Sequence, residues 1–78
     1  MSTFYVVRTE HLNDHPSLDW KVFEHFQDAK RRYSVGHAKW PDEIASVAMF
    51  QADADDVRQA IEQVKTGKAT LLKHCGPL

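Results

Sequence analysis

Histidine offers this chain its widest range of chemistry, and five histidines occur among its 78 residues. His11 and His15 have the i, i+4 spacing with which two imidazole groups can hold a zinc ion on a helix. Asn13, Asp14 and Pro16 instead place the pair in a loop, where this spacing does not align the two rings. No Cys-x-x-Cys accompanies them, so we predict solvated loop histidines, no metal site and no cofactor.

The remaining candidates for acid–base or nucleophilic chemistry are His25, with Glu24 or Tyr5 as its nearest partner, and Cys75. His25 follows Glu24 on a predicted strand, where adjacent side chains point to opposite faces. Cys75 follows His74, but adjacent side chains rarely converge, and we expect an inert thiol. The three glycines form no phosphate-binding loop, and no serine elbow is present. An enzyme or metal protein using His11, His15, His25 or Cys75 therefore stays a third hypothesis, behind two that need no catalysis.

A basic and aromatic segment, KRRYSVGHAKW, is the strongest candidate binding motif. Cationic side chains neutralise phosphates and aromatic rings stack on bases, so the segment is typical of nucleic-acid binding. The candidate binding residues are Lys30, Arg31, Arg32, Lys39 and Trp40. Tyr33 shares a helical stripe with Phe26 and Ala29, which favours core packing, and a solvated helix face explains the charges equally well. An acidic segment from Pro41 to Glu62 follows, so contact between the two charge blocks of neighbouring subunits is a further use.

Length and composition predict one folded domain spanning residues 1–78. The 42% of hydrophobic residues argues against disorder, and a net charge of −1 gives no general attraction to nucleic acid or to anionic membranes. A single cysteine cannot form an internal disulfide, which favours a reducing compartment such as the cytoplasm. No leader-like N-terminus or long apolar run is present, so we expect no membrane contact.

The elements follow from periodicity and from turn residues. β-Branched and aromatic runs predict strands over 3–10 and 20–25, with a loop over 11–19 between them. Helical spacing predicts a first helix near 27–35, for which Gly36 is a plausible stop and Trp40 before Pro41 a firmer one. A strand over 44–51 precedes a helix near 54–66 that is capped by Asp53 and stopped by Gly67. Residues 69–74 form either a short last strand or an irregular tail.

This order, β-β-α-β-α(-β), predicts an α+β fold, a two-layer sandwich with a mainly antiparallel sheet of three to four strands and both helices on one face. The strands over 3–10 and 44–51 are apolar on both faces, which leaves one face uncovered in this arrangement. An uncovered apolar face indicates an interface, so our leading hypothesis is a non-catalytic interaction or regulatory module that forms a homodimer. The candidate interface residues are Phe4, Val6, Val47 and Met49. A nucleic-acid-binding module is the alternative.

Overall fold

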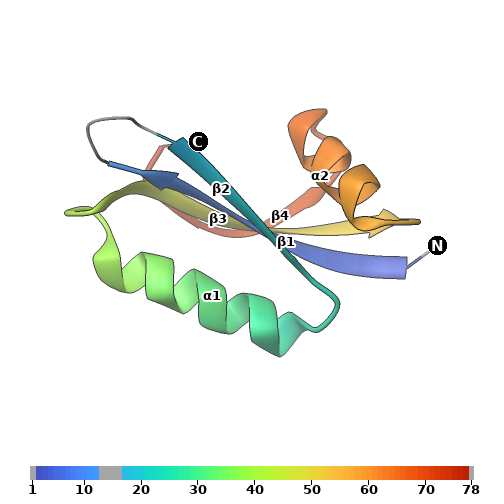
Figure 1. Cartoon of the computed structure of the whole chain (residues 1–78), viewed down its shortest axis with the longest axis horizontal. Coiled ribbons are helices and arrows are strands. Elements are labelled where there is room, and N and C mark those ends of the chain that lie inside the picture. Colours follow the sequence, from blue (N-terminus) through green and yellow to red (C-terminus); the bar gives the residue numbers. More distant parts are fainter. Residues whose placement is uncertain (1, 13–16, 78) are drawn as a thin grey trace.

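The chain alternates strands and helices in the order β1 (Ser2–His11), β2 (Ser17–Phe23), α1 (Phe26–Lys39), β3 (Ile44–Ala54), α2 (Val57–Lys65) and β4 (Thr70–Cys75). This computed structural model describes residues 2–12 and 17–77, and it confirms the predicted α+β fold with the final strand formed (Figure 1). His15 and the middle of the predicted loop over 11–19 lie outside the described residues. No helix within the described ranges is long and apolar enough to cross a membrane.

The four strands form one antiparallel sheet in the order β2-β1-β3-β4. β1 and β3 are therefore the interior strands, as their two apolar faces predict, and β2 and β4 are the edges. The longest pairing joins β1 to β3, with Val6 opposite Phe50 and Val7 opposite Met49. β3 is buried along most of its length, whereas β1 is buried mainly in its middle and has exposed residues near both ends.

The two helices cover opposite faces of this sheet, so the prediction that both lie on one face is wrong (Figure 1). Successive residues of a strand point to opposite faces, and Val6 packs in one hydrophobic cluster while Val7 packs in the other. The α2 cluster contains Ala60 and Val64 of the helix, and the α1 cluster contains Ala29 and Tyr33. Apolar residues on both faces of β1 and β3 show that two faces need cover, but they do not say which helix covers which.

The candidate interface residues are consequently part of the core. Phe4 and Val6 are 6% and 0% exposed in the cluster beneath α2, and Val47 and Met49 are each 0% exposed in the cluster beneath α1. None of the four side chains can meet a partner without displacing a helix. The uncovered apolar face that led to their selection does not exist at these positions.

Helix α1 continues for about one turn past Gly36, which is one of the two helix ends predicted from the sequence. A Cβ atom at Gly36 would lie 2.9 Å from Cγ2 of Val47, so this glycine lets the helix approach β3 closely instead of ending it. The helix ends at Trp40, before Pro41, as the other stop signal predicts.

Helix α2 begins later than expected, because β3 runs on to Ala54. The N-cap is Asp56, whose carboxylate accepts a 2.8 Å hydrogen bond from the Gln59 backbone amide. Asp53, the predicted cap, instead accepts a hydrogen bond from the Thr3 hydroxyl at 2.9 Å. Gly67 follows the helix with φ of 79°, which confirms its role as a left-handed stop.

Candidate anion-binding pocket

The basic residues of α1 point in three directions, although the sequence groups them. At roughly 100° of rotation per residue, Arg32 and Lys39 share one flank of the helix, Arg31 faces away from the sheet, and Lys30 lies on the opposite flank. Arg31 makes an exposed 3.7 Å ion pair with Asp28 of the preceding turn. Trp40 is 38% exposed at the end of the helix. The predicted binding segment therefore splits into separate surfaces, and only Arg32 and Lys39 come together.

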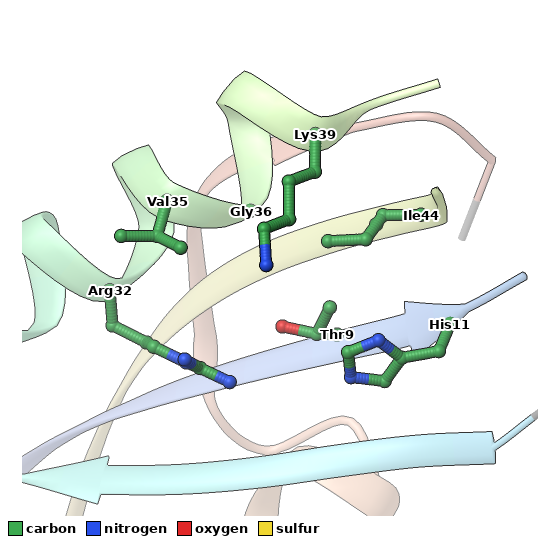
Figure 2. A pocket seen from close by; sticks show the side chains of 7 residues that line it. All are labelled: Thr9, His11, Arg32, Val35, Gly36, Lys39 and Ile44. Carbon is green, nitrogen blue, oxygen red and sulfur yellow. The ribbon is translucent and has the colours of Figure 1, made fainter. Parts of the chain in front are cut away.

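These two side chains line a small pocket between α1 and the end of β1 (Figure 2). Side chains two residues apart on a strand point to the same face, and side chains three, four or seven residues apart on a helix lie on the same side. The pocket forms where one such set on β1 faces one such set on α1. The pocket is lined by Thr9 and His11 of β1, by Arg32, Val35, Gly36 and Lys39 of α1, and by Ile44 of β3.

Three nitrogen-bearing side chains surround the Thr9 hydroxyl in this pocket. Figure 2 shows the Lys39 ammonium and the Arg32 guanidinium extending from the helix toward β1, where Thr9 and His11 project from the strand. Thr9 is only 2% exposed, and the cavity volume is about 20 Å³. This space suits one water molecule, or one oxygen atom of a ligand whose remainder stays at the mouth.

The electrostatics of the pocket depend mainly on Lys39. Arg32 is already engaged, because one of its guanidinium nitrogens lies 2.8 Å from an Asp19 oxygen of β2, and both side chains are about one-third exposed. Among the described residues, no carboxylate lies within 4 Å of the Lys39 ammonium. Lys39 also lies in the last turn of α1, where a cation favourably compensates the negative helix end. Asp19 holds the guanidinium group in place, while Lys39 supplies the unbalanced positive charge.

The other residues considered for acid–base or metal chemistry are not gathered at one site within the described part of the chain. His11 joins the pocket, and His25 is an exposed residue at the start of α1. Within residues 2–12 and 17–77, no group of three or more histidine, cysteine or acidic side chains is placed to hold a metal ion. The lining of the pocket can bind an anion by charge and hydrogen bonding, through the side chains of Lys39, Arg32, His11 and Thr9.

A second constellation, which we did not predict from the sequence, lies on the opposite flank of α1. The Sγ atom of Cys75 is 2.9 Å from Nδ1 of His37 and 3.2 Å from the hydroxyl oxygen of Tyr33. His74, which precedes Cys75 in the sequence, points to the other sheet face, with its Nδ1 3.2 Å from the Gly76 carbonyl oxygen. The i, i+4 spacing of Tyr33 and His37 was the available signal, but 38 residues separate His37 from Cys75.

No protein-family model matches the chain, and comparisons with curated proteins and with solved structures found no match.

Proposed function

We infer that the protein is a small binding module whose ligand carries an oxyanion, such as a phosphate or carboxylate group, held in the pocket between α1 and β1. The observation that carries this inference is the Lys39 ammonium beside the buried Thr9 hydroxyl, with Arg32 and His11 completing the lining. A cation and a hydroxyl donor suit an anionic oxygen, because charge-assisted hydrogen bonds are about twice as strong as neutral ones.

The same arrangement favours a compact anion over a strand of nucleic acid. Binding along a phosphate backbone needs several cations on one continuous surface, with aromatic side chains between them. Here Lys30, Arg31 and Lys39 face three different ways, and Asp28 and Asp19 pair with two of the arginines. The pocket has room for one oxygen atom, which suits a terminal group of a ligand.

The experiment is a titration of the ¹⁵N-labelled protein with inorganic phosphate and, separately, with acetate at low ionic strength. We expect amide shifts at Thr9, His11, Arg32 and Lys39, with little change on α2. Lys39→Gln should weaken binding about tenfold, since a hydrogen bond to a charged group contributes roughly 1.5–3 kcal/mol. Lys30→Gln removes the same charge from the other flank of the same helix and should leave the affinity within about twofold.

The comparison of the two lysine variants decides the proposal. Equal weakening by Lys30→Gln and Lys39→Gln would indicate general charge attraction and would overturn a defined site. Binding of labelled RNA or DNA that depends on Lys30 and Arg31, with no phosphate response in the pocket, would favour the nucleic-acid alternative.

We propose a cytoplasmic location for the protein, because its single cysteine gives it no internal disulfide.

Self-association is a second candidate function, supported by the edge strand β4 instead of an open face. Leu71 and Leu72 are 40% and 37% exposed on this strand, whose outer edge pairs with no strand among residues 2–12 and 17–77. An exposed edge with apolar side chains is a template for pairing with another chain. A homodimer joined along β4 would keep both helices in place, as the buried core requires.

A further inference from the structure

Cys75 of β4 contacts two side chains of α1, those of Tyr33 and His37. Its Sγ atom is 2.9 Å from Nδ1 of His37, within reach for transfer of a proton between sulfur and imidazole. His37 is one turn beyond Tyr33 on the helix, and their rings stack with centroids 6.2 Å apart. Cys75 is partly exposed and His37 is exposed, so solvent and small molecules can reach the pair.

Tyr33 adds a hydrogen-bond donor to the sulfur. Burial, the hydrogen bond with Cys75 and the neighbouring sulfur charge together raise the pKa of Tyr33 to about 12. The phenol therefore keeps its proton throughout the neutral range and can donate it to a sulfur that carries negative charge. The hydroxyl lies 3.2 Å from Sγ, and this separation suits such a hydrogen bond because sulfur is a large acceptor.

An open depression in the surface adjoins this constellation. It has a volume of about 360 Å³ and is lined by Tyr33, Ser34, His37 and Lys73. Two of these four side chains also contact the sulfur, so a ligand in the depression lies close to the thiol. Lys73 and Cys75 are two residues apart on β4 and face the same side of the sheet, which places an ammonium group near the reacting atom.

We propose that Cys75 is a nucleophilic thiol, with His37 as its base, for small electrophiles that carry an anionic group, which Lys73 attracts. In the step, a carbon–sulfur bond forms at the electrophilic carbon while the bond to the leaving group breaks. The leaving group departs with the bonding electron pair, and the thiol proton passes to Nδ1 of His37. No electron is gained or lost by the protein, so no oxidant or second cysteine is needed.

The constellation supports this chemistry better than a metal or a disulfide. The described residues place no third metal-binding side chain beside Cys75 and His37. The sequence contains one cysteine, so the thiol cannot form an intramolecular disulfide. An activated nucleophile beside a base that is itself positioned by a neighbour is the usual arrangement of covalent catalysis, and Tyr33 stacks on the imidazole as that neighbour.

The test measures alkylation rates of the purified full chain with iodoacetate and with iodoacetamide near pH 7, followed by intact-mass spectrometry. We expect faster alkylation than for a free small thiol. His37→Asn should slow the reaction by at least about tenfold, as general base catalysis typically contributes 10²–10⁴-fold. His74→Asn is the matched control, since His74 precedes Cys75 but lies on the opposite sheet face.

Charge selectivity is tested with the ratio of the two rates. Lys73→Gln should lower the iodoacetate rate relative to iodoacetamide about threefold, whereas Lys68→Gln, an exposed lysine beyond α2, should not change the ratio. Circular dichroism of each variant establishes that it is folded. Equal rates for His37→Asn and His74→Asn, or an ordinary thiol rate in the parent protein, would overturn the proposal. Phosphate binding on the other flank of α1 is measured separately, so either proposal can fail alone.

Discussion

Tyr33 packs in the hydrophobic core beneath α1 and also contacts the thiol of Cys75. Its sequence position on a stripe with Ala29 predicts a core residue, and its 9% exposure agrees with that. The same side chain ends at Cys75, where its hydroxyl faces the sulfur at 3.2 Å. Apolar residues at helical spacing predict which side chains are buried. They do not predict which polar atom a buried tyrosine hydroxyl contacts.

Burial of Tyr33, together with its contact with Cys75, predicts a loss of stability at high pH. The pKa of Tyr33 rises from the ordinary 10.0 to about 12 in the folded state, so the folded protein holds this proton more tightly than the unfolded chain does. The stabilising contribution is present in full below pH 10 and is lost as the pH rises from about 10 to 12. The free energy of unfolding should fall across this window by up to roughly 1.4 kcal/mol per pH unit.

Urea unfolding of the parent and of Tyr33→Phe at a series of pH values between about 8 and 11.5 isolates this effect. Tyr33→Phe cannot ionise, so its stability should decline less steeply above pH 10 even if it starts lower. Identical slopes for the parent and Tyr33→Phe would show that the tyrosine does not titrate differently in the two states.

At the scale of elements, α1 organises both candidate sites because it lies close to the sheet. Gly36 is buried against Val47, and this approach brings the flanks of the helix down to the level of β1 on one side and β4 on the other. The anion pocket lies on the flank of Arg32 and Lys39, and the thiol lies on the flank of His37. A helix farther from the sheet would separate each of these sets.

We therefore expect Gly36→Ala to destabilise the protein, although alanine has the higher helix propensity. The added methyl group would meet Val47 side-chain atoms at 2.9 and 3.2 Å, and Val47 is fully buried with a stiff β-branched side chain. Overpacking typically costs about 1–3 kcal/mol, against a gain of roughly 0.8–1 kcal/mol from propensity. The net change in the free energy of unfolding should be a loss of about 1 kcal/mol.

A double-mutant cycle with Val47→Ala checks the cause. Val47→Ala alone should destabilise by leaving a cavity, while Gly36→Ala should become neutral or stabilising in that background, because the space is then free. Chemical denaturation of the four proteins gives the coupling energy. An additive cycle would mean that the helix shifts freely and that close packing at Gly36 does not hold it in place.

The elements were largely predictable because their signals are local. Alternating and periodic apolar residues identify the first three strands and both helices, while residues 69–74 fit either a strand or a tail. Gly67 and Pro41 mark two helix ends correctly. The face on which each helix lies is not local, since Val6 and Val7 are equally apolar and differ only in direction. The contact of Cys75 with His37 depends on that placement, and so does the meeting of Arg32 with His11.

For the whole molecule, the remaining question of assembly concerns the sheet edges, because the faces of β1 and β3 are covered by the chain's own helices and side chains. The β2 edge carries one exposed leucine, Leu18, followed by charges of the kind that discourage pairing, Asp19 and Lys21. The β4 edge presents Leu71 and Leu72 next to each other. A two-fold dimer through β4 would extend the sheet without a rearrangement of either helix.

This reasoning predicts concentration-dependent association through β4. Sedimentation velocity over a range of protein concentrations should show a monomer–dimer equilibrium, and Leu72→Lys should raise the dissociation constant at least about tenfold by placing a charge on the edge. Val57→Lys makes the same change at an apolar residue of α2 that is 49% exposed, and it should leave the equilibrium unchanged. A monomer at every concentration, or equal effects of the two lysine substitutions, would exclude β4 as the interface.

Because Cys75 faces α1 from the same strand, pairing along β4 should leave its alkylation rate unaltered, which separates assembly from thiol chemistry.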